Sequence, residues 1–200
     1  RVVVQIIQGS NELIGMGKKV SDMAIERLES KGVGVILNHY INKVGPAEIE
    51  LKSLAGKISK MKSDLLIWTG GVKADTVDVD AYLRSKKNRN VFAVGDNALT
   101  DSRLPMLARY AFEEGALTSG NLLREMRGEK LLPFKPGLDI VIIPIAGKFG
   151  ILKYKNIVIG GKIAWYARRL VDLWYCLQIL PPFRALKKWR RDTSIFVEND

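Results

Sequence analysis

Apolar runs and helical patterns alternate along the first part of the chain. Residues 2–7 form a β-branched run that predicts a buried strand. Apolar positions at helical spacing follow, with Ser21 as the expected N-cap and Gly32 as the expected stop. Residues 33–37 predict a second strand. A strand–helix–strand unit is typical of a parallel sheet covered by helices, so we expect an α/β fold.

The later elements are predicted from apolar runs and the turn residues between them. Short β segments are expected at 41–44, 47–51 and 57–59, and buried strands at 64–68 and 90–94. Residues 72–90 are polar and predict a crossover between two lobes. A helix is expected from near Pro105 to about Arg127. The C-terminal elements are a hairpin over 138–145 and 148–159 turning at Gly147, a helix of about 19 residues ending at Leu180, and a short basic helix after Pro181 and Pro182.

The C-terminal part of the chain is rich in basic residues. The chain carries 32 Lys and Arg against 21 Asp and Glu, a formal net charge of +11. Residues 160–191 hold eight basic side chains and a single acidic one. Such a balance suits a polyanionic partner, either nucleic acid or an anionic lipid surface. No nucleic-acid motif accompanies it, so we favour the lipid surface and expect no nucleic acid.

Residue counts exclude several kinds of chemistry within this chain. Cys176 is the single cysteine, so an internal disulfide and a cysteine-rich metal site are excluded. His39 is the single histidine, and no metal site is predicted. No run of about 18 uncharged apolar residues predicts a spanning helix, and Arg1 leads straight into an apolar run without a signal-peptide pattern. A chain that opens in mid-strand is expected to be a fragment or a processed piece.

The most specific string in the sequence is Asn-Val-Phe-Ala-Val-Gly-Asp-Asn-Ala at 90–98. It places Gly95 and Asp96 at the carboxyl end of an apolar strand, where open α/β sheets bind ligands. Glycine permits close approach of the backbone, and a carboxylate accepts hydrogen bonds from sugar-like hydroxyls. On spacing alone, a buried strand that ends in an Asp turn explains the string equally well.

This string resembles the second flavin-binding motif of two-dinucleotide-domain flavoproteins. The resemblance implies that Gly95 admits FAD and that Asp96, followed by Asn97, faces the ribityl or pyrophosphate side of the cofactor. It also implies that the helix start after Pro105, at Met106, Leu107 and Ala108, faces the flavin ring. A helix N-terminus there stabilises negative charge on a reduced flavin.

The first 75 residues resemble the NAD(P)H-binding domain of the same family. Residues 67–72, with Gly70 and Gly71, are similar to the segment that lies beside the nicotinamide. Residues 1–9 resemble the second strand of that domain, which usually ends in an acid that binds the adenosine ribose. This chain has Gln8 there, and a neutral amide does not repel a 2′-phosphate, so the resemblance allows NADPH as well as NADH. A solvated strand-end residue is the alternative interpretation of Gln8.

The segment from Lys155 to Tyr175 resembles the C-terminal membrane-association segment of type II NADH dehydrogenases. Helical spacing supports this, with apolar residues on one side and Arg168, Arg169 and Asp172 on the polar side. Basic residues with aromatic residues at the border suit a helix lying in a membrane surface. A helix packed on its own domain or on a second copy in a homodimer is the alternative. The membrane-facing residues are predicted to be Ile163, Trp165, Tyr166, Leu170, Trp174 and Leu177.

Two departures from the family pattern limit the resemblance. The family's quinone-side helix reads A-Q-x-A-x-Q-Q-G, and residues 108–115 keep that frame with Arg109 and Glu113 in place of two of its three glutamines. The resemblance implies a quinone-side role for both, and an i,i+4 ion pair is the alternative. Neither G-x-G-x-x-G loop of the family is present in the chain. We therefore expect the C-terminal half of an enzyme, whose other half or a partner chain supplies those loops.

The sequence thus predicts an α/β chain with partial Rossmann-like lobes. Residues 1–78 would belong to the NAD(P)H-binding domain, 79–132 to the FAD-binding domain, and 133–200 to a hairpin and membrane-association helices. The implied activity passes electrons from NAD(P)H through FAD to a quinone, peripherally at the cytoplasmic face of a membrane. No side chain is predicted to be a catalytic acid or base. A soluble NAD(P)H–flavin oxidoreductase with another acceptor and a non-catalytic membrane-anchoring subunit are the alternatives.

Overall fold

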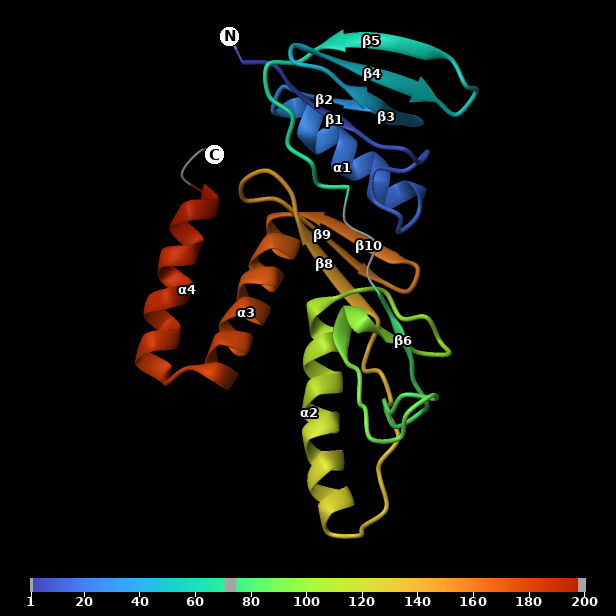
Figure 1. The fold of residues 1–200 in the computed structure, drawn as a ribbon. Helices are drawn as coiled ribbons and strands as arrows, with labels where there is room; N and C mark the ends of the chain where they lie inside the picture. The colour runs from blue at the N-terminus through green and yellow to red at the C-terminus, as the bar shows by residue number, and fades with distance from the viewer. Residues whose placement is uncertain (1, 71–74, 198–200) are drawn as a thin grey trace. The chain divides into compact units, whose positions relative to one another are not determined.

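A computed structural model describes residues 2–70 and 75–197, with side chains described to residue 194. The chain forms two compact units (Figure 1). Unit 1 comprises Arg1–Leu66 with Asp139–Asp200, and unit 2 comprises Ile67–Leu138. This grouping shows which residues pack together and not which residues bind a cofactor. The division at residues 78 and 132 therefore stays a prediction.

Unit 1 begins with the predicted strand–helix–strand motif. Strands β1 (Val4–Ile7) and β2 (Val33–Ile36) pair in parallel, and helix α1 (Lys18–Ser30) connects them. The helix begins three residues before Ser21, after Gly17 with φ +101. Ser21 is no cap, because its Oγ accepts a hydrogen bond from the backbone N–H of Leu13 (2.8 Å).

The prediction that the first strand is buried is wrong. Val2 and Val3 are 88% and 73% exposed, and Val4 at the start of β1 is exposed as well. Within the described residues β1 has a hydrogen-bonded neighbour, β2, on one edge. A strand in such a two-stranded sheet keeps much of its surface in solvent.

An antiparallel sheet follows in the order β3-β4-β5. Its strands are β3 (His39–Val44), β4 (Glu48–Ser53) and β5 (Ile58–Lys62). They confirm the three short β segments expected there. The buried strand predicted at 64–68 is wrong, because this stretch is irregular and Leu65 is 78% exposed. It pairs with no strand in the part of the chain that the structure describes.

A second antiparallel sheet of unit 1 comes from the C-terminal part of the chain. It contains β8 (Ile140–Pro144), β9 (Gly150–Tyr154) and β10 (Ile157–Gly161) in the order β10-β9-β8. The turn at Gly147 is confirmed, with φ +77. The single strand expected over 148–159 is instead two strands, because the chain turns again at Lys155, where φ is +51.

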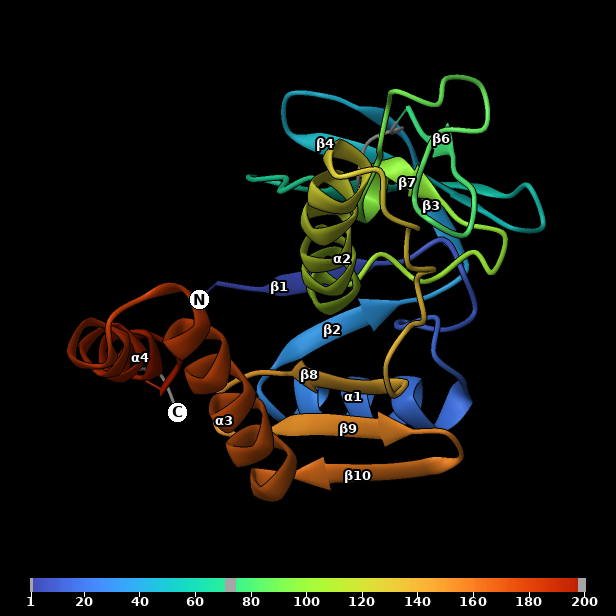
Figure 2. The ribbon, with the colours of Figure 1, turned by 90° about the horizontal axis from the view of Figure 1, so that it is seen from below.

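Helices α1 and α3 (Lys162–Ile179) pack on opposite faces of this second sheet (Figure 2). Side chains alternate along β9. Ile151 joins the core that Val20 and Ala24 of α1 contribute. At Gly150, a Cβ atom would lie 2.8 Å from the backbone nitrogen of Trp165 on α3. Glycine at that position therefore lets α3 approach the sheet closely.

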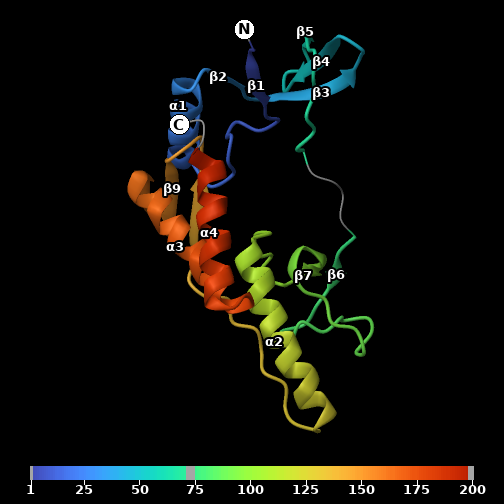
Figure 3. The same cartoon turned by 90° about the vertical axis from the view of Figure 1, so that its left-hand side faces the viewer.

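The predicted helix to Leu180 is confirmed as α3, and a second helix lies beside it (Figure 3). Helix α4 runs over Pro182–Val197, 16 residues in all, and is longer than the short helix expected. The two prolines end α3, because proline cannot continue a helix. Proline at the first position of a helix costs no hydrogen bond, so Pro182 can begin α4. Among the described residues, no helix combines the length and apolarity needed to cross a membrane.

Unit 2 is built around helix α2 (Ala108–Met126) and a small core. A short parallel pair, β6 (Val77–Asp78) and β7 (Ala98–Leu99), flanks the one-turn helix η1 (Gly95–Asn97). The core cluster is Val79, Leu83 and Ala93. The predicted polar crossover over 72–90 therefore includes buried residues. Of that crossover, residues 72–74 lie outside the described residues.

Two boundaries in unit 2 differ from the sequence prediction. Residues 90–94 form no regular strand and make a single bridge, from Phe92 to Arg84, while Ala93 N–H donates to the Leu83 carbonyl (3.1 Å). Helix α2 begins at Ala108, three residues after Pro105. It ends before Gly128 as predicted, where φ is +69.

Candidate functional site

The Gly95–Asp96 turn is held against helix α2. Gly95 has φ +64, a conformation that favours glycine. A Cβ atom there would lie 3.1 Å from the Cβ of Ala111 on α2. The Gly95 N–H donates a hydrogen bond to Glu114 Oε2 at 2.6 Å. Glycine is required here both for the backbone conformation and for the close approach of the helix.

A cavity of about 220 Å³ lies beside this turn, within unit 2. Four of the residues predicted to bind FAD line it: Gly95, Asp96, Met106 and Leu107. Tyr110 and Glu114 of α2 line it as well. Of the other two predicted residues, Asn97 is exposed at the end of η1 and Ala108 is the first residue of α2. The structure thus gathers two stretches of sequence around one cavity.

The groups around the cavity fit part of a dinucleotide cofactor. Asp96 is exposed and makes no hydrogen bond or ion pair with any described residue, so its carboxylate is available to ligand hydroxyls. Leu107 supplies no side-chain cap to α2, so the first-turn N–H groups have no such partner. Met106 and Leu107 add an apolar wall. Small-molecule sites usually enclose roughly 300–1,000 Å³, so unit 2 offers a partial site.

Glu114 is a residue of this site that the sequence analysis missed. It is 3% exposed, and burial raises the pKa of its carboxyl group. The Gly95 N–H bond acts in the opposite direction, and the charges of Asp96 and Glu113 raise the pKa further. One signal was available in the sequence. Glu114 lies one helical turn after Ala111 and Tyr110, on the face of α2 that packs against the Gly95–Asp96 turn.

Arg109 and Glu113 form the i,i+4 ion pair that the sequence left as an alternative. Arg109 Nε lies 2.8 Å from Glu113 Oε1, and the guanidinium lies over the Tyr110 ring. Glu113 Oε2 also accepts a hydrogen bond from Gly137 N–H at 3.1 Å. This pair links α2 to the segment that returns along it. The quinone-side role of both residues stays a prediction.

The residues predicted to bind NAD(P)H are distributed over both units. In unit 1 the amide of Gln8 donates to Ser10 Oγ (3.1 Å) and to the Glu12 carbonyl (3.4 Å), which holds it in the loop after β1. In unit 2 Gly70 is exposed, and a Cβ there would lie 2.9 Å from the Trp68 ring. Gly71 lies outside the described residues. The assignment of these positions to NAD(P)H stays a prediction.

Helix α3 presents an apolar stripe to solvent. Five of the six predicted membrane-facing residues are exposed along it: Ile163, Tyr166, Leu170, Trp174 and Leu177. Trp165 is the exception, because it is 4% exposed and its ring meets the Tyr166 ring edge-on. One residue along a helix is a rotation of 100°, which takes Trp165 off the stripe and onto the sheet side.

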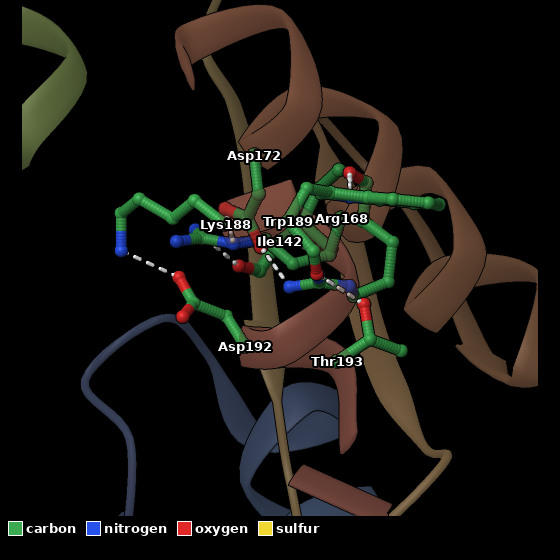
Figure 4. A network of polar contacts seen from close by, with 8 residues as sticks. Ile142, Arg168, Asp172, Lys188, Trp189, Asp192 and Thr193 are labelled. Atoms are coloured by element: carbon green, nitrogen blue, oxygen red, sulfur yellow. Dashed lines mark hydrogen bonds and ion pairs between the residues drawn. The ribbon is translucent and has the colours of Figure 1, made fainter. Parts of the chain in front are cut away.

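The prediction that Arg169 lies on a polar outer side is wrong. Arg169 is 4% exposed and joins α3 to α4. Figure 4 shows its partners Asp172, Trp189 and Thr193. Its guanidinium donates to the Trp189 carbonyl (2.6 Å) and to Thr193 Oγ1, and pairs with Asp172 (3.1 Å). The Trp189 ring N–H donates back to the Arg169 carbonyl (2.6 Å). Because α4 covers this side of α3, most of the exposed basic residues of the two helices are on α4. They are Lys162 on α3 and Arg184, Lys187, Lys188, Arg190 and Arg191 on α4.

The parallel strand–helix–strand unit with its connecting helix is typical of α/β proteins with Rossmann-like domains. Comparison with protein families agrees. The pyridine nucleotide-disulphide oxidoreductase family model matches residues 1–115, so the chain belongs to that family. Its name mentions a disulphide, but this chain has one cysteine, Cys176, which is buried.

Curated relatives confirm the resemblance to type II NADH dehydrogenases. The chain is 23% identical over 195 residues to the type II NADH:quinone oxidoreductase Ndh of Mycobacterium tuberculosis, covering 87% of this chain and 42% of that protein. It is 24% identical over 122 residues to the mitochondrial external alternative NAD(P)H-ubiquinone oxidoreductase B3 of Arabidopsis thaliana, covering 52% of this chain and 21% of that protein. The chain therefore spans less than half the length of these relatives.

Solved structures share the fold. The NDH2 of Plasmodium falciparum in complex with NADH superimposes with a TM-score of 0.80 at 14% identity, covering 96% of this chain and 57% of that one. The sulfide:quinone oxidoreductase of Aquifex aeolicus gives a TM-score of 0.67 at 16% identity, covering 99% and 55%. These matches confirm an α/β fold of the Rossmann-like flavoprotein type with a C-terminal sheet and helices.

Proposed function

We propose that this chain is the C-terminal part of a FAD-dependent NAD(P)H dehydrogenase that delivers electrons to a quinone at a membrane surface. One observation carries the proposal. In a chain of the pyridine nucleotide-disulphide oxidoreductase family, the Gly95–Asp96 turn and the segment that leads into α2 line one cavity. Relatives whose names specify NAD(P)H or NADH and a quinone support the donor and the acceptor.

Each group around the cavity has a defined task in this proposal. Asp96 accepts hydrogen bonds from hydroxyls on the ribityl or pyrophosphate side, and Gly95 gives the backbone room to approach. The N-terminus of α2 at Ala108 favours negative charge on the ring system. When bound, FAD accepts a hydride from NAD(P)H and passes electrons to the quinone, while the protein supplies binding and orientation. No side chain of the site is assigned as an acid or a base.

The site is incomplete within these 200 residues. No G-x-G-x-x-G loop is present, and such loops hold the pyrophosphate groups of both dinucleotides. The chain spans less than half of its curated relatives. We propose that another segment of the protein, or a partner chain, supplies the loops.

A flavin titration tests this division of the site. The isolated 200-residue chain is expected to bind FAD weakly or not at all, and addition of a segment that carries the loops is expected to restore binding. In the restored complex Asp96→Ala should lower FAD affinity by about tenfold or more, as expected for a lost charge-assisted hydrogen bond. Asp78→Ala, the same change at an exposed acid of β6 outside the cavity lining, is the matched comparison. Stoichiometric flavin on the isolated chain would overturn the proposed division.

The electron acceptor is tested separately from the flavin. Arg109 and Glu113 lie at the start of α2, at the positions where the family has two glutamines, and they are proposed to border the quinone. Steady-state assays with a water-soluble quinone should show NAD(P)H oxidation that Arg109→Gln and Glu113→Gln change through KM for the quinone. Equal rates with and without quinone would instead favour a reductase with another acceptor.

The membrane contact is proposed to be the outer surface of α3 and α4. The α3 stripe is apolar and exposed, and Phe183 at the start of α4 is 82% exposed. Solvent-facing basic residues on α4 add attraction to anionic lipid, each worth about 1 kcal/mol near the surface. An apolar stripe beside basic groups fits a helix pair lying in the headgroup region of the anionic cytoplasmic leaflet.

Vesicle flotation decides between this surface and its alternatives. The chain should float with anionic vesicles, and Ile163→Asp combined with Leu170→Asp should abolish flotation. Ile58→Asp, at an exposed apolar position on β5, is the control and should leave flotation unchanged. Replacing Arg184, Lys187, Arg190 and Arg191 by Gln should weaken binding about 10²–10³-fold. A stable dimer that forms through the stripe without lipid would favour a homodimer interface instead.

A further inference from the structure

We infer that Glu114 is a positioning residue that holds the Gly95–Asp96 turn in place and so fixes where the Asp96 carboxylate meets the cofactor. The inference deepens the proposed function and rests on it for the identity of the cofactor. The hydrogen bond itself stands independently, because both partners belong to unit 2. Within the proposal, Asp96 touches the cofactor and Glu114 acts through the turn.

The geometry assigns this role to one strong contact. Glu114 Oε2 accepts the Gly95 N–H at 2.6 Å, and the bond joins residues 19 apart in the sequence. A hydrogen bond to an ionised carboxylate is roughly twice as strong as one between neutral groups. Ala111 adds close steric packing between the turn and the helix. The bond therefore fixes the turn directly before Asp96.

The surroundings of Glu114 disfavour the charged form of its carboxyl group. The side chain is nine-tenths or more buried, and burial disfavours its charge. The carboxylates of Asp96 on η1 and Glu113 on α2 add repulsion, and Arg103 in the loop before α2 lines the same cavity. A glutamine would accept the same N–H without these costs. An acid at this position makes the strength of the bond depend on its ionisation.

Amide NMR on the full chain tests the contact. The Gly95 amide proton shift should follow the ionisation of Glu114 as pH is varied, and Glu114→Gln should abolish that titration. Asp96 carries a carboxyl group in the same turn, so Asp96→Asn is measured as well and should leave the Glu114 titration in place. Glu114→Met, which keeps the volume and removes the acceptor, should speed hydrogen exchange at Gly95 by tenfold or more. Glu125→Gln, a more exposed acid of α2 that pairs with Arg84, is the matched control and should change neither readout.

Flavin binding then tests the positioning role. In the protein with its complete FAD site, Glu114→Met should lower FAD affinity by about tenfold, and Glu114→Gln should restore it to within about threefold of the wild type. Loss of Gly95 protection with unchanged FAD affinity in Glu114→Met would overturn the positioning role. An unperturbed Gly95 amide in both variants would overturn the contact itself. If the wild type binds no flavin, the proposed function fails, and the amide data still decide the contact.

Discussion

Gly95 combines two constraints that a larger residue cannot satisfy. Its φ of +64 lies in the left-handed region, and the space beside it is taken by Ala111. Both constraints come from the way the turn meets α2. The residue before Asp96 therefore decides whether the carboxylate can reach the cavity.

A pair of Gly→Ala changes tests this at one residue. Gly95→Ala should destabilise the folded chain by about 1–2 kcal/mol, because alanine is strained at positive φ and crowds Ala111. Gly115→Ala lies in the middle of α2, where a Cβ meets nothing within 4 Å. It should stabilise the chain by about 0.5–1 kcal/mol through helix propensity. Urea unfolding followed by circular dichroism measures both, and equal effects would contradict the turn geometry.

The pKa of Glu114 gives a prediction with a defined sign. Burial raises its pKa in the folded state, so the folded chain holds this proton more tightly than the unfolded chain. The stabilising contribution is complete below the ordinary carboxyl pKa and is lost as pH rises through the raised value. Thermal unfolding from about pH 4 to about pH 8 should show Glu114→Gln gaining stability relative to the wild type as pH rises. If the difference in stability between Glu114→Gln and the wild type did not change with pH, the pKa of Glu114 would be the same in the folded and unfolded states.

The sequence singled out Asp96, which lines the cavity, and missed Glu114 for a physical reason. Asp96 follows a glycine in a local string, so short-range spacing is enough to find it. Glu114 matters because α2 packs against a turn 19 residues earlier, and that contact depends on tertiary structure. Trp165 was misplaced for the same kind of reason, since one helical step separates the sheet side of α3 from its exposed stripe.

At the scale of elements, helix α3 is held between a sheet and a second helix. Gly161 and Pro181 flank α3 and Pro182 begins α4, so the sequence predicted both helices, but it predicted α4 too short. Arg169 was assigned to solvent because nothing in the local pattern shows that α4 folds back over α3. The strands at 64–68 and 90–94 were overpredicted, because an apolar run becomes a strand when a neighbour pairs with it.

Arg169 is expected to fasten α4 to α3. Arg169→Met keeps much of the volume and removes the hydrogen bonds to Trp189 and Thr193, which should cost about 2 kcal/mol. Hydrogen exchange over residues 182–194 should then rise while exchange over β8 to β10 stays unchanged. Arg190→Met, an exposed position on α4, is the comparison and should leave exchange unchanged. Equal protection of α4 from hydrogen exchange in both variants would contradict the role of Arg169 in holding α4 against α3.

At the scale of the whole molecule, the features that support the proposed function are distributed over both units. Unit 2 has a cavity with the Gly-Asp turn, and unit 1 has the parallel strand pair, the C-terminal sheet and the apolar stripe. The fold class could be predicted from local patterns of apolar and turn residues. The division into packing units could not be predicted in this way, because Asp139–Asp200 packs with a segment more than seventy residues earlier in the chain.

The central claim is that these residues serve a flavin enzyme whose remaining loops lie outside them. Intact-mass analysis combined with flavin absorbance, on protein purified from its native source, tests it most directly. The account predicts a species larger than 22.4 kDa, or a complex with a second chain, that carries one FAD per site. A 22.4 kDa species without flavin and without a partner would contradict it, and would leave lipid binding by α3 and α4 as the function to pursue.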